Sequence, residues 1–290
     1  MNRKHEFASR AITLVLIVLC AVGVDVRAVP LLPETELTWK NVTVDGRKTA
    51  VFCIFRDSRG IMWIGTNNGL FFYDGVTVHP VGRDVMTGTQ IYSIVEHEGK
   101  LFLGGNNGLM TYDYKKGTVS HGSASLPKEI RCMSLVDNQL WVGSLYGMYR
   151  QDVTSGQVSN CSAGLPHKSV YSILRDSRGI LYAGTYNGLA RWNYNTGKFL
   201  RVRADIGNRA SKNLFVNCLL ESPDNESIFI GTEGTLYRYS PAEGTWTSIV
   251  ALNNNTIKSL TRGADGHIII GTDNGVFDWS STGVRHYRHD

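Results

Sequence analysis

Residues 57–75 read DSRGIMWIGTNNGLFFYDG, and this stretch decides the fold. It contains an Asp-Ser-Arg-Gly turn, an apolar run ending in Gly65-Thr66, an Asn-Asn-Gly turn and a second apolar run. Asp and Gly favour tight turns, because the Asp side chain bonds its own backbone and Gly accepts a positive φ. Short apolar runs bounded by such turns predict antiparallel strands joined by hairpins.

The apolar run and its glycine recur along the whole chain. The six glycines are Gly65, Gly104, Gly143, Gly184, Gly231 and Gly271, separated by 39, 39, 41, 47 and 40 residues. In each unit one strand pattern precedes this run, as at Val51–Arg56, and two follow it. Four strands in a repeat of about 40 residues are typical of a β-propeller blade.

We therefore predict an all-β fold, a β-propeller of six four-stranded antiparallel blades within residues 29–290, without a helix. A solenoid of parallel strands would not need a tight hairpin in each unit. Residues 37–44 also read as a strand, but no three strands precede it. Because Val284–Tyr287 already supplies an outer strand for the sixth blade, residues 37–44 suggest an incomplete seven-bladed ring. A complete six-bladed ring is the alternative.

Residues 1–28 have the pattern of a secretory signal peptide. Met1–Arg10 is basic, Ala11–Val24 is an apolar run of 14 residues, and small residues at Val26 and Ala28 precede Val29. A membrane span needs about 20 apolar residues, so an uncleaved signal anchor is less favoured. No later stretch approaches that length. We expect an exported, periplasmic protein with no membrane span after the signal segment.

The composition limits the classes of partner. Of the 290 residues, 42% are hydrophobic and 19% are charged, a balance that argues against disorder and a coiled coil. Removing the four basic and two acidic residues of 1–28 lowers the formal charge from +5 to +3. So small a charge does not call for a nucleic acid or another polyanion.

The cysteines occupy a repeated position rather than forming obvious pairs. Cys53, Cys132 and Cys218 share one slot of the first strand in alternate units, and serine holds that slot in the other units. Strands in alternate blades lie too far apart for a bond that needs Cα atoms within about 7 Å. We predict no disulfide among these three residues.

The loops between the second and third strands supply the candidate ligand-binding residues. Amides form paired hydrogen bonds with sugar hydroxyls, and aromatic rings offer flat surfaces to a pyranose. The candidates are Asn68, Asn107, Tyr146, Tyr186, Asn187 and Asn274. Turn formation is the competing explanation for asparagine before glycine, whereas a turn does not require the two tyrosines.

The longest connection, between the fourth and fifth blades, contains Arg209 and Lys212. Arginine can bind a carboxylate through two hydrogen bonds, so these residues are candidates for acidic sugars such as uronates. A solvated loop is the favoured explanation for them.

Catalytic and metal sites find little support in the sequence. The histidines fall at unrelated positions of the repeat, with no metal-ligand spacing. Asp57 and Asp176 recur at the hairpin, where turn formation explains them. We predict no catalytic residue, no metal site and no cofactor.

The stretch 57–75 and its near copy Asp176–Trp192 resemble the two-component regulator propeller repeat. The resemblance extends over about residues 35–290. It implies the periplasmic ligand-binding part of a hybrid two-component sensor, which typically recognises oligosaccharides. The partners that it implies are an oligosaccharide and a second propeller or sensor chain.

The chain departs from that family, because it contains neither kinase nor receiver region and only six Gly-centred units. It is expected not to transfer phosphate itself and to be a truncated or split sensor domain. A protein-interaction propeller is the first alternative function, and a propeller lyase or glycosidase is the second.

Overall fold

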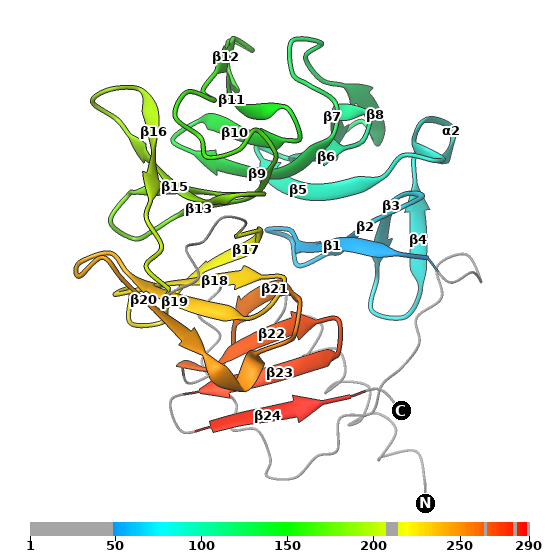
Figure 1. Ribbon diagram of the computed structural model, residues 1–290. Helices are drawn as coiled ribbons and strands as arrows, with labels where there is room; N and C mark the ends of the chain where they lie inside the picture. Colours follow the sequence, from blue (N-terminus) through cyan, green and yellow to red (C-terminus); the bar gives the residue numbers. More distant parts are fainter. Residues whose placement is uncertain (1–48, 207–213, 264–265, 281–282, 289–290) are drawn as a thin grey trace, which may run out of the picture.

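The chain forms six four-stranded antiparallel sheets around one axis (Figure 1), which confirms the predicted β-propeller. A computed structural model describes residues 49–206, 214–263, 266–280 and 283–288. The predicted signal peptide (1–28) and the strand predicted at 37–44 lie outside these residues. In every sheet neighbouring strands are consecutive in the chain, so each blade is a simple meander.

In each of the first three blades the outer strand is the shortest. Blade one contains β1 (Val51–Arg56), β2 (Met62–Thr66), β3 (Gly69–Tyr73) and β4 (Val78–Val81). Blade two contains β5 (Ile91–His97), β6 (Lys100–Gly105), β7 (Gly108–Asp113) and β8 (Thr118–His121). Blade three contains β9 (Ile130–Val136), β10 (Gln139–Ser144), β11 (Gly147–Asp152) and β12 (Val158–Asn160).

The last three blades repeat this arrangement. Blade four contains β13 (Val170–Arg175), β14 (Leu181–Thr185), β15 (Gly188–Asn193) and β16 (Lys198–Val202). Blade five contains β17 (Val216–Glu221), β18 (Ile228–Thr232), β19 (Leu236–Ser240) and β20 (Thr245–Ile249). Blade six contains β21 (Ile257–Arg262), β22 (Ile268–Thr272), β23 (Gly275–Ser280) and β24 (Gly283–Tyr287).

The innermost strands β1, β5, β9, β13, β17 and β21 surround the axis, each in contact with the next along the chain (Figure 1). The second strands lie one step further out and are covered on both faces. All five residues of β2, β14 and β18 are buried. This double burial explains why these strands are continuously apolar rather than alternating.

In the first five blades, the recurring glycine of the second strand (the central glycine) packs against a β-branched side chain of the next blade. A Cβ on Gly65 would lie 3.0 Å from Cγ2 of Ile91, and a Cβ on Gly184 would lie 2.5 Å from Cγ1 of Val216. The side chains that fill this position are fully buried, namely Ile91, Ile130, Val170, Val216 and Ile257. The recurring glycine is therefore required by blade packing.

Blade six and blade one do not form this contact in the described part of the chain. The three atoms nearest to a Cβ built on Gly271 all belong to Ser259 of its own blade. Val51, the first-blade counterpart of Ile91, is 47% exposed. Ile269 is only half-buried, whereas its counterpart Phe229 is buried. The glycine contact thus joins five successive pairs of blades and leaves a seam between the sixth and the first.

The Asp-Ser-Arg-Gly hairpin also links neighbouring blades. Asp57 Oδ1 accepts hydrogen bonds from the backbone N–H groups of Arg59 (3.0 Å) and Ile61 (2.9 Å), and Oδ2 accepts one from Trp63 Nε1 (2.9 Å). The backbone N–H and hydroxyl of Ser58 both donate to Glu96 of blade two at 2.7 Å. The motif therefore closes its own turn and fastens it to the next blade.

Two short helical turns correct the expectation of no helix. Helix α2 (Arg83–Met86) lies in the connection between blades one and two, and the 3₁₀ turn η1 (Val250–Leu252) follows β20. Each buries one apolar side chain, Met86 or Leu252. Elements this short have no repeating apolar pattern, so periodicity could not reveal them.

The four cysteines of the described chain are free thiols. Cys53 and Cys218 lie beside the central glycines, and Cys53 Sγ donates to the carbonyl oxygen of Ile91 at 3.7 Å. Burial raises the pKa of Cys53 and of Cys218 to about 12. The position of Cys53 and Cys218 beside the glycine therefore requires a small, uncharged side chain.

Candidate functional site

In the loops between second and third strands, a side-chain hydroxyl forms hydrogen bonds with the loop backbone. Thr66 Oγ1 donates to the carbonyl oxygen of Gly69 (2.9 Å) and accepts from the backbone N–H of Asn68 (3.0 Å). Thr185 forms the same pair of hydrogen bonds with Gly188 and Asn187. The same hydroxyl-to-carbonyl hydrogen bond is formed by Ser144, Thr232 and Thr272, whereas blade two has Gly105 at this position.

The side chains of Asn68 and Asn107 bind the connection between blades one and two. Asn68 Oδ1 accepts from the N–H of Gly88 at 2.9 Å, and Asn107 Nδ2 donates to Thr89 Oγ1 at 3.1 Å. These hydrogen bonds are internal, so they favour the turn explanation for both residues.

Asn187 and Asn274 also contact neighbouring strands. The carbonyl oxygen of Asn187 accepts from Arg201 Nη2 (3.3 Å), and that of Asn274 bonds His286 Nε2 (2.6 Å). The amide oxygen of Asn187 is buried without a hydrogen-bond partner in the described structure. Arg209 and Lys212 lie outside the described residues.

The two predicted tyrosines are exposed on this end of the molecule. Tyr146 is 58% exposed and Tyr186 is 48% exposed. The Tyr186 ring centroid lies 5.2 Å from those of His167 and Phe215, and Phe215 lies 4.5 Å from Tyr171. The structure therefore places Tyr186 in a group of aromatic rings that spans blades four and five.

A second set of residues at this end was not predicted. Each innermost strand carries a β-bulge at its second residue, as between Val51 and Cys53 or between Val170 and Ser172. A bulge leaves one residue unpaired and redirects its side chain. The six bulge residues, here called the axial rim, are Phe52, Tyr92, Arg131, Tyr171, Asn217 and Lys258.

Contacts between neighbouring blades show that these side chains converge. The rings of Phe52 and Tyr92 are 4.9 Å apart, and Arg131 Cζ lies 4.0 Å from the Tyr92 centroid. Asn217 Nδ2 donates to the carbonyl oxygen of Ile257 in blade six at 3.0 Å. These contacts link the axial rim across blades one, two and three, and link blade five to blade six.

A sequence pattern marks the positions of the axial rim. Every rim residue immediately precedes the small Cys or Ser of the first strand, as in Phe52-Cys53 and Tyr171-Ser172. Five of the six residues at this position are aromatic or cationic, and the sixth is Asn217.

The electrostatics of the hairpin aspartates give them a structural role. The Asp57 side chain is fully buried in an ion pair with Arg59. Burial alone would raise the pKa of Asp57, but the hydrogen bonds from Trp63, Arg59 and Ile61 outweigh it and lower that pKa. A carboxylate held ionised and fully bonded is a poor general acid. Among the described residues, no group of His, Cys, Asp and Glu could hold a metal ion.

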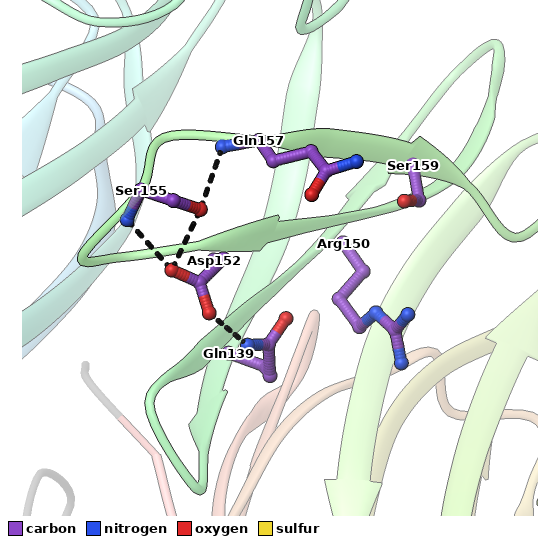
Figure 2. Close-up of a pocket in the computed structure, with 6 residues that line it drawn as sticks. All are labelled: Gln139, Arg150, Asp152, Ser155, Gln157 and Ser159. Atoms are coloured by element: carbon purple, nitrogen blue, oxygen red, sulfur yellow. Dashed lines mark hydrogen bonds between the residues drawn. The ribbon is translucent and has the colours of Figure 1, made fainter.

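A polar pocket lies on the outer part of blade three, at the end opposite the loops (Figure 2). Its cavity volume is about 540 Å³, and its lining residues are Gln139, Arg150, Asp152, Ser155, Gln157 and Ser159. Asp152 accepts hydrogen bonds from Gln139 Nε2 and from the N–H and hydroxyl of Ser155. The carboxylate is thus already satisfied, and none of the predicted site residues reaches this pocket.

No helix within the described residues is long and apolar enough to cross a membrane.

Comparison with known proteins identifies the repeat. The family model described as two component regulator propeller matches residues 46–68 and 164–187. No curated protein matches the chain.

Two crystal structures show the extracellular domain of BT4673 from B. thetaiotaomicron, described as a putative one-component system in one and a putative hybrid two-component system in the other. They share 35% and 34% sequence identity with this chain, each with a TM-score of 0.80. The alignments cover 87% of this chain, which spans 35% of the length of each solved chain.

More distant structures share the fold alone. The extracellular domain of the putative hybrid two-component system BT3049 from B. thetaiotaomicron has 19% identity and a TM-score of 0.70, over 83% of this chain and 35% of that one. A streptogramin B lyase has 14% identity and a TM-score of 0.68, over 83% of each chain.

Proposed function

The chain carries two component regulator propeller repeats, and from this we propose that it is the ligand-sensing propeller of a two-component regulatory system. The similarity to extracellular domains of such systems supports this proposal at 34–35% identity. Because the chain spans 35% of those proteins, the signalling activity of a whole sensor is part of the proposal.

The proposed ligand is an oligosaccharide. The observation that carries this proposal is the aromatic surface at the loop end, where Tyr186, Phe215 and Tyr171 pack as neighbours while Tyr186 remains 48% exposed. Exposed rings lose conformational freedom at little cost and stack on the C–H face of a sugar. Asn217 and the loop asparagines would add hydrogen bonds to hydroxyl groups.

The proposed role is binding without turnover. The hairpin aspartates are occupied by turn hydrogen bonds, and the half-buried thiols of Cys53 and Cys218 have a pKa raised to about 12. The proposal also includes export by residues 1–28, which is tested by expressing the chain in a Gram-negative host. Mass spectrometry of the periplasmic protein should then find Val29 as the first residue.

Titration calorimetry on the exported protein tests the sensing role. Neutral and acidic oligosaccharides are titrated in turn, and each mixture is afterwards analysed by chromatography. We expect heat of binding from at least one saccharide and no new products. Turnover of a saccharide would refute the non-enzymatic role, and absence of any saccharide binding would refute the proposed ligand class.

A further inference from the structure

We propose that the axial rim, together with the adjoining rings of Phe215 and Tyr186, binds a neutral, extended oligosaccharide that crosses the propeller axis and stacks on aromatic rings at both sides. This inference rests on the proposed function and assigns its ligand to one set of residues. The rim residues come from six different blades, so a ligand held by them must lie over the axis rather than on one blade.

The aromatic residues form two separate platforms. The first platform consists of Phe52 and Tyr92 on blades one and two, with ring centroids 4.9 Å apart. The second consists of Tyr171, Phe215 and Tyr186 on blades four and five, with successive centroids 4.5 and 5.2 Å apart. In a ring of six blades, blades one and two lie opposite blades four and five. A ligand that stacks on both platforms therefore has to be longer than one sugar unit.

The exposed rings lie at the outer ends of the platforms. Phe52 is 43% exposed and Tyr186 is 48% exposed, whereas Tyr92 and Tyr171 are partly covered. Aromatic side chains of this size are normally covered in a folded domain. Their partial exposure leaves apolar ring faces available for stacking.

The arginine of the rim already has a carboxylate neighbour. Arg131 Nη2 forms an ion pair with Glu129 Oε2 at 2.9 Å, and its guanidinium lies over the Tyr92 ring. A ligand carboxylate would have to compete with Glu129 for Arg131. This pairing favours a neutral sugar over a uronate.

Calorimetry with two matched ligand series tests the inference. The probes are neutral gluco- and xylo-oligosaccharides of two to eight units, and oligogalacturonides of the same lengths. The variants are Phe52→Ala and Tyr186→Ala, one for each platform. Tyr194→Ala is the control, because Tyr194 is 59% exposed but lies at the opposite end of its blade, where its hydroxyl bonds Gly179.

We expect a neutral series to bind, with affinity that rises with length until both platforms are occupied. Each platform variant should weaken the longest neutral ligand roughly two- to tenfold, since one aromatic contact contributes about 0.5–1.5 kcal/mol. The Tyr194→Ala variant should leave binding unchanged. Circular dichroism of all three variants checks that the fold is retained.

The outcomes separate this inference from the proposed function. If both platform variants bind saccharides with unchanged affinity, or if the protein binds oligogalacturonides more tightly than neutral sugars, the assignment to the axial rim is wrong. Neither result would contradict the sensing role. Equal affinity for two and eight units would overturn the crossing of the axis. Failure of every saccharide to bind the unchanged protein would overturn the proposed function itself.

Discussion

Gly184→Ala and Gly271→Ala form a matched pair that tests the packing between blades. Neither glycine has a positive φ, so alanine is compatible with the backbone at both positions. At both, the new Cβ would meet the hydroxyl of a serine in the same blade, Ser172 or Ser259. Only at Gly184 would it also lie 2.5 Å from Cγ1 and 3.1 Å from Cβ of Val216 in the next blade.

The difference between the two substitutions can be estimated from these contacts. Carbon atoms normally approach to about 3.5–4.0 Å, so Val216 or its whole blade must move in Gly184→Ala. Val216 is fully buried, and overpacking of this kind costs about 1–3 kcal/mol. The serine conflict and the backbone effect of replacing glycine occur in both variants and largely cancel. For a domain of this size, the difference corresponds to roughly 2–12 °C in Tm.

Thermal unfolding followed by circular dichroism measures both variants against the unchanged protein. We expect Gly184→Ala to unfold at the lower temperature, with Gly271→Ala between it and the parent. Equal Tm values for the two variants would refute the argument that the side chain from the next blade dominates the requirement for glycine.

Three further predictions follow from the same structure. Val170→Asp should abolish folding because Val170 is fully buried, whereas Val51→Asp should be tolerated at a position that is 47% exposed; soluble yield and circular dichroism distinguish them. Because the folded-state pKa of Asp57 is lowered, its ionised form stabilises the fold above about pH 4 and this contribution is lost as the pH falls through the folded-state value. Urea titrations from pH 7 to 2.5 should show this acid loss, and Asp57→Asn should reduce both it and the neutral-pH stability by about 1–3 kcal/mol. With thiol pKa values of about 12, Cys53 and Cys218 should react with a thiol reagent at pH 8 only after unfolding, and rapid labelling of the folded protein would contradict their burial.

The sequence predicted the fold well because each blade repeats the same local rules. The turn at Asp57–Gly60, the glycine at 65 and the Asn-Asn-Gly loop are separate signals that agree within one unit, and the six-fold recurrence of the glycine removes the ambiguity of any short apolar run. The position of α2 could not be predicted, because a four-residue helix depends on burying Met86 rather than on a pattern.

The candidate site was harder to predict, since side-chain direction depends on backbone register. The amides of Asn68 and Asn107 are of a type that binds sugar hydroxyls. In the structure, however, their side chains form hydrogen bonds with Gly88 and Thr89. The strand pattern alone does not show which way Phe52 and Tyr171 point. Their direction depends on the β-bulge. Val51 pairs with Thr66 and Cys53 pairs with Gly65, so Phe52 between them is unpaired and its side chain is redirected toward the axis.

Because of the seam, we expect the blades to unfold like an open array of repeats rather than like a closed ring. Within the described residues, blades two to five are each held by the glycine contact on both sides, and blades one and six on one side only. Stability in such an array is set by nearest neighbours, so opening should start at the two ends and proceed inward. Hydrogen exchange should accordingly be fastest in β1–β4 and β21–β24 and slowest in β9–β15.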